Sequence, residues 1–166
     1  PTVGHAENFK AVKKTAGNCD WFIYLSQSVD KKGSNPLDPD RKLYYAKKMF
    51  PNFAKHFRSG PREPVAILTE LQKEGYDDAM FVVGSDRVNA MKWVKKYNGK
   101  DFFFRNLDVI SSGDRDADGD TFAISGTKMR RAAVANDFDA FRKGIPKGLN
   151  DKDTRKLMEE IKANMP

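Results

Sequence analysis

The residues best suited to phosphate chemistry lie near the two ends of the chain. Thr2, Gly4 and His5 precede one amphipathic segment, and Ser125 and Thr127 precede another far downstream. A glycine lets a ligand approach the backbone closely, and the first N–H groups of a helix attract anions. A histidine can hydrogen-bond a phosphate. These types and spacings predict two phosphate-binding helix starts, with ordinary capped helix starts as the alternative.

Arg130 falls one turn into the downstream segment. Its planar guanidinium would place a permanent positive charge beside a phosphate bound at Ser125 and Thr127. The alternative is that Arg130 is an ordinary solvent-exposed residue of the helix. Reactions at a phosphorus atom need positive charge and hydrogen-bond donors around the developing negative charge. The two segments together supply both.

The elements that would position these residues alternate between helices and strands. Hydrophobic periodicity and breaker residues predict helices over 4–16, 38–50, 64–75, 88–96, 128–136 and 151–162. Apolar runs predict strands over 21–25 and 79–83, a short one over 53–57, and one more at 102–104 or 107–110. This order predicts βαβ units with a parallel sheet, in which ligands bind beyond the carboxyl ends of the strands.

Composition limits the class of protein and its partners. The 166 residues fit one domain, and 30 Lys and Arg against 23 Asp and Glu give a net charge of +7, which favours an anionic partner. The basic residues are interspersed, so solvated helix faces are favoured over a nucleic-acid stripe. Nucleic-acid binding, which rests on the net charge and the interspersed aromatic residues, is the less favoured alternative and would show a steep salt dependence. Cys19 has no partner for a disulfide or a zinc site and is expected to be a small buried residue. Without a membrane-length apolar run or a signal-peptide pattern, a soluble intracellular protein is expected.

Three separated segments resemble signatures of the nucleotidyltransferase superfamily. Residues 1–5, PTVGH, resemble its (H/T)xGH signature, and residues 124–130, ISGTKMR, resemble ISSTxxR with Gly126 where serine is commoner. Residues 82–87, VVGSDR, look like the GxD segment of the adenylyltransferase branch. The order agrees with that family over essentially the whole chain, and residues 26–37 are similar to cytidylyltransferase-like proteins of tailed phages.

The resemblance implies a fold and a reaction. The fold would be a Rossmann-like α/β/α sandwich with a parallel sheet, formed by residues 1–166 as one domain with 137–166 as its C-terminal helical portion. The reaction would transfer a nucleotidyl group from an NTP to a small phosphorylated acceptor, with Mg²⁺ carried by the NTP and pyrophosphate released. Adenylyl transfer from ATP is favoured, because Asp120-Thr121-Phe122-Ala123 stands where the branch that makes CDP-linked products commonly has RTxG. A phage-encoded member would act in the host cytoplasm or the virion. The sequence leaves open whether the protein forms a homo-oligomer.

The resemblance also assigns roles to residues. The catalytic residues would be Thr2, His5 and Arg130. One of two neighbouring basic residues, Arg41 or Lys42, would bind the acceptor or a phosphate, unless both are surface charges. Asp86 would contact the nucleotide or organise the site, with a helix cap as the alternative. No metal ligands are expected among these residues, and those expected to bind the nucleotide are Gly4, Gly84, Asp86, Ile124, Ser125 and Thr127.

Two further interpretations compete with this one. Residues 114–120 have the DxDxDG spacing of a calcium loop, but Ser125 occupies the twelfth position, where a bidentate Glu belongs, so an acidic loop without calcium is favoured. The second is a non-catalytic nucleotide-binding or structural protein that retains the fold. In the family a strand and a turn, together about ten residues, precede the first signature, whereas this sequence starts at Pro1. We therefore expect a fragment whose true start lies upstream; a protein that begins here would favour the non-catalytic alternative.

Overall fold

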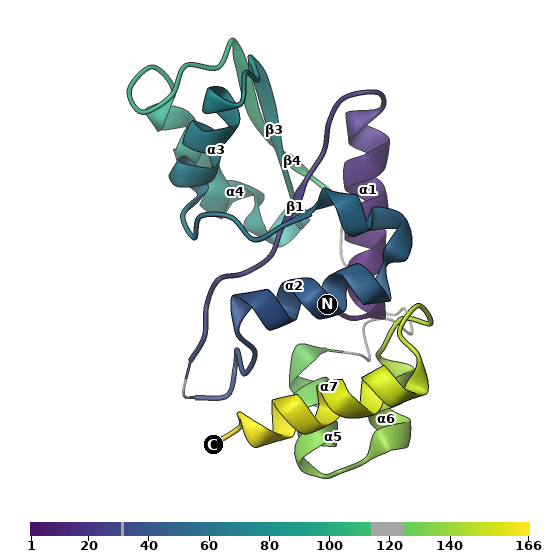
Figure 1. Ribbon diagram of the computed structural model, residues 1–166. Coiled ribbons are helices and arrows are strands. Elements are labelled where there is room, and N and C mark those ends of the chain that lie inside the picture. Colours follow the sequence, from purple (N-terminus) through teal and green to yellow (C-terminus); the bar gives the residue numbers. More distant parts are fainter. Residues whose placement is uncertain (31, 114–124) are drawn as a thin grey trace. The chain divides into compact units, whose positions relative to one another are not determined.

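The computed structural model describes residues 1–30, 32–113 and 125–166 (Figure 1). The protein is mixed α/β, and its strands pair in parallel, as the alternation of elements predicts. The chain forms two compact units. The first unit contains Pro1–Glu7, Asp20–Ser59 and Asp116–Pro166, and the second contains Asn8–Cys19 and Gly60–Arg115.

The first unit has a short parallel pair of strands, β1 (Ile23–Tyr24) and β2 (Phe57–Arg58). Both are shorter than the expected strands, and most of the segment 53–57 instead belongs to a 3₁₀ helix, η2 (Pro51–His56). Side-chain contacts explain the difference. The Trp21 and His56 rings stack with centroids 3.6 Å apart, and His56 Nδ1 lies 2.9 Å from the carbonyl oxygen of Trp21. These contacts join the two segments where ladder hydrogen bonds were expected.

Of the helices of the first unit, those predicted over 38–50, 128–136 and 151–162 form close to these positions. Asn150 caps the last helix as expected, because its side-chain oxygen accepts the backbone N–H of Asp153 at 2.8 Å. The helices are η1 (Val3–His5), α2 (Pro39–Met49), α5 (Gly126–Val134), α6 (Phe138–Lys143) and α7 (Asp151–Ala163).

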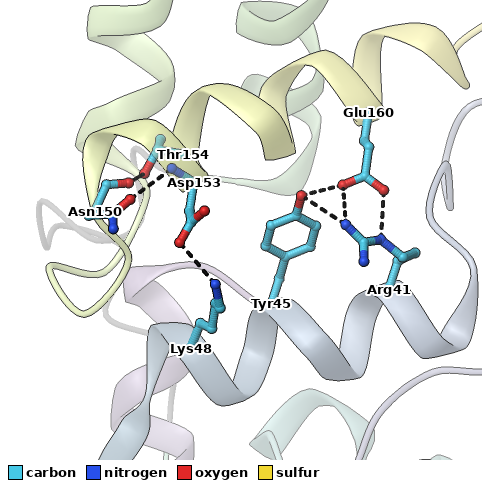
Figure 2. A network of polar contacts seen from close by, with 7 residues as sticks. All are labelled: Arg41, Tyr45, Lys48, Asn150, Asp153, Thr154 and Glu160. Carbon is cyan, nitrogen blue, oxygen red and sulfur yellow. Dashed lines mark hydrogen bonds and ion pairs between the residues drawn. The ribbon is translucent and has the colours of Figure 1, made fainter.

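Helices α5, α6 and α7 pack together around apolar side chains. Phe141 and Leu149 are completely buried there, as is Thr154, whose hydroxyl donates to the carbonyl of Asn150 at 2.7 Å. Helix α7 also runs antiparallel to α2, and Figure 2 shows the polar side chains that join the two helices. Further buried residues on α5 and α7 are Met129, Ala133, Leu157, Met158 and Ile161.

The second unit contains a longer parallel pair, β3 (Asp78–Val83) and β4 (Asn106–Ser111). The strand predicted at 79–83 is confirmed. Of the two alternatives for the last strand, 107–110 is the one that forms, because Phe102 and Phe104 point into the core instead of joining the ladder.

The remaining helices of the second unit surround these strands. They are α3 (Pro64–Lys73), η3 (Ser85–Arg87), α4 (Val88–Met91), η4 (Lys92–Tyr97) and α1 (Ala6–Ala16), which belongs to this unit from Asn8 onward. Helices α3 and α4 lie along one face of the β3–β4 pair (Figure 1). The core between them consists of Leu68, Val94, Phe102, Phe104, Leu107 and Val109.

Two sequence expectations about this unit need correction. The helix predicted over 88–96 is a single α-turn followed by the 3₁₀ helix η4, which buries Val94 in the core of this unit. Cys19 is exposed, since it follows the turn that ends α1 at Gly17. Within the described ranges, no helix has the length and apolar character needed to cross a membrane.

Candidate functional site

The PTVGH segment forms a small hydrogen-bonded unit in front of α1. Thr2 occupies the N-cap position of η1, and its backbone N–H donates to His5 Nδ1 at 3.0 Å. The Thr2 hydroxyl lies 3.2 Å from the same nitrogen. Because Nδ1 accepts a hydrogen bond, the neutral imidazole carries its proton on Nε2. His5 is exposed whereas Thr2 is buried, so a buried partner fixes the orientation of an exposed imidazole ring.

The same segment is attached to the C-terminal helices of the first unit. The Val3 N–H donates to the carbonyl of Gly144, at the end of α6, at 3.1 Å. The His5 N–H donates to the carbonyl of Thr2 at 3.0 Å and closes the 3₁₀ turn. Gly4, half-buried, lies within that turn. The structure therefore places the first signature and α5, the helix of the second signature, in one unit.

The start of α5 gathers positive charge. Ser125 is its N-cap and accepts the backbone N–H of Lys128 at 3.2 Å. The Arg130 guanidinium turns back along the helix and donates to the Thr127 hydroxyl at 3.1 Å. A Cβ atom on Gly126 would lie 3.0 Å from Arg130 Nη1, so the glycine leaves space for the guanidinium.

This arrangement works against the electrostatics of the helix. A helix N-terminus carries partial positive charge and favours acidic residues, but the first turn of α5 contains none. In the part of the chain that the structure describes, no carboxylate pairs with Arg130. An anion bound at the start of α5 would relieve the repulsion between the guanidinium and the helix.

Arg41 is occupied by a bidentate ion pair with α7. Its Nε and Nη2 donate to the two carboxylate oxygens of Glu160 at 2.7 and 2.9 Å (Figure 2). The Tyr45 hydroxyl donates to the same carboxylate. The hydrogen bond from Arg41 lowers the pKa of Glu160, and burial raises the pKa of Tyr45 above its usual range. Arg41 thus holds α2 against α7, which accounts for its charge without a ligand.

Lys42 is directed to the loop that follows β1. Its ammonium donates to the carbonyl oxygens of Ser26 and Ser28 at 3.1 and 2.6 Å. Burial lowers the pKa of Lys42, and the nearby carboxylates of Asp30 and Asp38 oppose that shift. The ammonium also lies within electrostatic range of the Pro1 nitrogen. Of the two basic candidates, Lys42 is the one at the carboxyl end of a strand and near the first signature.

Gly84 and Asp86 follow β3 in the second unit. A Cβ atom on Gly84 would lie 2.8 Å from Asp86 Oδ1, so the carboxylate turns back over the glycine. The Arg87 N–H donates to the carbonyl of Gly84 at 2.8 Å and forms the turn into η3. Their place at the carboxyl end of a parallel strand agrees with the sequence pattern. Their joint use with residues of the first unit stays a prediction.

Two predicted features lie outside the described residues. Ile124 is one, and the acidic segment 114–120, with its calcium-loop spacing, is the other. Among the residues that are described, no group of three or more His, Cys, Asp or Glu side chains is arranged to hold a metal ion.

Sequence reasoning did not identify Asp30, the residue that holds the loop contacted by Lys42. Asp30 folds the loop beside Lys42 by accepting the backbone N–H groups of Lys32 and Ser34, both at 3.0 Å, and the Asn35 amide at 2.8 Å. The Asn35 hydrogen bond is the main cause of the lowered pKa of Asp30. The polar, turn-rich composition of residues 26–36 predicts a loop after the first strand, but it does not identify Asp30 as the residue that holds the loop.

The α2–α7 contacts also had a signal in the sequence. Arg41 and Lys48 are seven residues apart on α2, and Asp153 and Glu160 are seven apart on α7, so each pair lies on one helix face. Lys48 bonds Asp153 at 3.0 Å, and Arg41 bonds Glu160. Matching charges on two antiparallel helices can be read from spacing only once the two helices are known to be neighbours.

Comparison of the chain with protein-family models, with curated proteins and with solved structures finds no match. A function must therefore be proposed from the residues and their geometry.

Proposed function

We propose that the protein is a nucleotidyltransferase with a Rossmann-like α/β/α sandwich. It transfers a nucleotidyl group, adenylyl in preference to cytidylyl, from an NTP to a small phosphorylated acceptor and releases pyrophosphate. An oxygen of the acceptor phosphate attacks the α-phosphorus, and the bond between that phosphorus and the oxygen bridging to the β-phosphate breaks. The two parallel strand pairs support this fold. Polar loops follow β1 and β3 at their carboxyl ends, which is where ligands bind in folds of this type.

The observation that carries the proposal is the start of α5. The Arg130 guanidinium, the Thr127 hydroxyl and the first N–H groups of the helix converge there without an acidic residue in the first turn. The β- and γ-phosphates of an NTP supply the negative charge that this arrangement lacks. As pyrophosphate leaves, its charge increases, so these donors stabilise the transition state more than the bound substrate.

His5 supplies a donor for the α-phosphate. Its Nε2 carries the proton because Nδ1 accepts the Thr2 N–H. A neutral imidazole in this tautomer donates a hydrogen bond to a phosphate oxygen without transferring the proton. Thr2 acts as a positioning residue through its backbone N–H, which holds the ring.

Lys42 is the proposed contact for the acceptor phosphate, in preference to Arg41. Its ammonium has three donors, and two carbonyl oxygens account for two of them. Mg²⁺ would enter with the NTP, because such ions are bound mainly by substrate phosphates and water. The metal would neutralise charge on the leaving pyrophosphate.

The test is magnesium-dependent release of pyrophosphate, measured with each of the four NTPs against a panel of phosphorylated acceptors. The panel contains nicotinamide mononucleotide, phosphopantetheine, flavin mononucleotide and glycerol phosphate. His5→Ala should abolish release, whereas His5→Gln, whose amide N–H reaches the position of Nε2, should retain part of it. His56→Gln is the matched control, since His56 is the other histidine and bonds the Trp21 carbonyl.

Two outcomes would contradict the proposal. One is no pyrophosphate from any NTP and acceptor, using protein expressed from its whole natural reading frame. The other is release that His5→Ala and Arg130→Ala leave unchanged. NTP binding without any release would instead identify the non-catalytic alternative.

A further inference from the structure

One strongly basic stretch of the chain lies in the second unit. Residues 87–105 contain six Lys or Arg and one Asp, a local net charge of +5. Two of these charges are paired locally, since Lys95 bonds Asp108 at 3.4 Å and Arg105 bonds Asp78 at 2.8 Å. For Lys96 and Lys100, both exposed, the described part of the chain provides no ion-pair partner.

Two large aromatic side chains lie among these lysines. Trp93 and Tyr97 are each 38% exposed, and their rings meet edge to face with centroids 5.5 Å apart. Helix η4 has the 3₁₀ repeat of three residues, which places Lys96 on the same face as Trp93. Val94, on another face of the helix, is completely buried and anchors it to the core.

A tight turn holds Lys100 beside Tyr97. The Lys100 N–H donates to the carbonyl of Tyr97 at 3.0 Å. The Asn98 side chain bonds both the N–H and the carbonyl of Phe104, at 2.8 and 3.0 Å, and Gly99 takes a positive φ of 92° to complete the turn. We call Trp93, Lys96, Tyr97 and Lys100 the Trp93 surface. Its backbone is fixed on both sides of Tyr97.

We propose that the Trp93 surface binds single-stranded nucleic acid. Unpaired bases stack on exposed aromatic rings, and the phosphates between them contact lysines, which is the combination found here. Charge complementarity favours this partner over an uncharged peptide. An anionic membrane would require a continuous apolar face, but lysines separate the two aromatic residues along η4. This surface belongs to the second unit and is independent of the proposed nucleotidyl transfer.

The first experiment measures fluorescence anisotropy of a labelled 20-nucleotide oligo(dT) at several salt concentrations. Trp93→Leu should weaken binding by about tenfold, whereas Trp93→Phe, which keeps an aromatic ring, should bind nearly as tightly as the natural protein. Replacing Lys96 and Lys100 together with alanine should reduce the slope of log K against log salt by about 1.4, at about 0.7 per phosphate contact.

Lys13→Ala/Lys14→Ala provides the matched control for charge. These two lysines are also exposed on a helix of the second unit. The helix has no exposed large aromatic residue. The control should leave both the affinity and the salt slope unchanged. Circular dichroism of each variant checks that the fold is retained.

A second experiment requires no change in the Trp93 surface. The chain has two tryptophans, so in a Trp21→Phe protein the tryptophan emission comes from Trp93 alone. Oligo(dT) should quench that emission as bases stack on the ring. The proposal is overturned if no quenching occurs at low salt. It is also overturned if duplex DNA, heparin or anionic vesicles bind as tightly as oligo(dT) and Trp93→Leu does not alter binding.

Discussion

The hydroxyl of Tyr45 offers a test of how α2 is held against α7. Tyr45 is only 2% exposed, and its hydroxyl donates to the Glu160 carboxylate that also receives two bonds from Arg41 (Figure 2). Tyr45→Phe removes this hydroxyl and keeps the buried ring, so no cavity forms. A hydrogen bond to a charged group contributes about 1.5–3 kcal/mol. Because the Glu160 side chain is 31% exposed, water replaces part of the loss, and we expect the lower end.

Urea unfolding at pH 7 measures the change directly. The free energy of unfolding should fall by about 1.5 kcal/mol in Tyr45→Phe, which corresponds to about 3–6 °C in Tm for a chain of this size. Tyr44→Phe is the matched control, because Tyr44 is the adjacent tyrosine and is 41% exposed. It should change the free energy of unfolding by less than about 0.5 kcal/mol.

Acidification should remove the same contribution. The folded-state pKa of Glu160 is lowered, chiefly by the hydrogen bond from Arg41, so the stability that its charge provides is present above the unfolded pKa of about 4.3. That stability is lost as the pH falls through the folded pKa. The difference between the natural protein and Glu160→Gln should therefore shrink below about pH 4.

A double-mutant cycle with Tyr45→Phe and Glu160→Gln decides whether the contact is the cause. The two changes should be coupled by about 1 kcal/mol at pH 7, since they share one interaction. Strictly additive effects, or a Tyr45→Phe protein as stable as the Tyr44→Phe control, would refute the assignment of this contact as a support for α7.

Two further substitutions test local features. Thr127→Val removes the hydroxyl to which Arg130 Nη2 donates at 3.1 Å; NTP affinity by calorimetry should weaken about fivefold, equivalent to one hydrogen bond, and an unchanged affinity would remove the Thr127 hydroxyl from the phosphate site. Asn150→Ala removes the cap of α7 and should lower the free energy of unfolding by about 1 kcal/mol, whereas Asn150→Ser should restore most of it; equal stability of all three would exclude a capping role.

Local signals in the sequence predicted the elements that depend on local chemistry. Helix α2 begins at Pro39, α3 begins at Pro64, and α7 follows the Asn150 cap, each where proline or a capping residue indicates. Strand β3 follows from a run of apolar residues. Such signals act over a few residues, so no knowledge of the packing was needed.

Features that depend on distant partners could not be predicted in this way. The segment 53–57 has the apolar content of a strand but forms most of η2, because the stacking of Trp21 on His56 joins residues far apart in the sequence. Likewise, Arg41 and Glu160 are 119 positions apart, and neither residue type specifies the other. Arg41 therefore seemed equivalent to Lys42 until the ion pair was known.

In the candidate site, too, some features follow from the local sequence and others depend on distant partners. The threonine and histidine of PTVGH are three residues apart, which is the spacing of a capping box, so their hydrogen bond follows from local geometry. The return of Arg130 over Gly126 is also local, being one helical turn. The two signatures also belong to one unit, in which the Val3 N–H donates to the carbonyl of Gly144. This contact joins distant parts of the chain, so no local sequence pattern predicts it.

The most direct test of the proposed reaction follows the α-phosphorus of the nucleotide. ATP labelled with ³²P at the α-position is incubated with the protein, Mg²⁺ and the phosphorylated acceptors, and the products are separated. We predict that the label moves into an acceptor-linked nucleotide while γ-labelled ATP yields labelled pyrophosphate, and that His5→Ala stops both. Transfer of the γ-label to the acceptor or its release as inorganic phosphate, or no movement of either label with any NTP, would contradict nucleotidyl transfer.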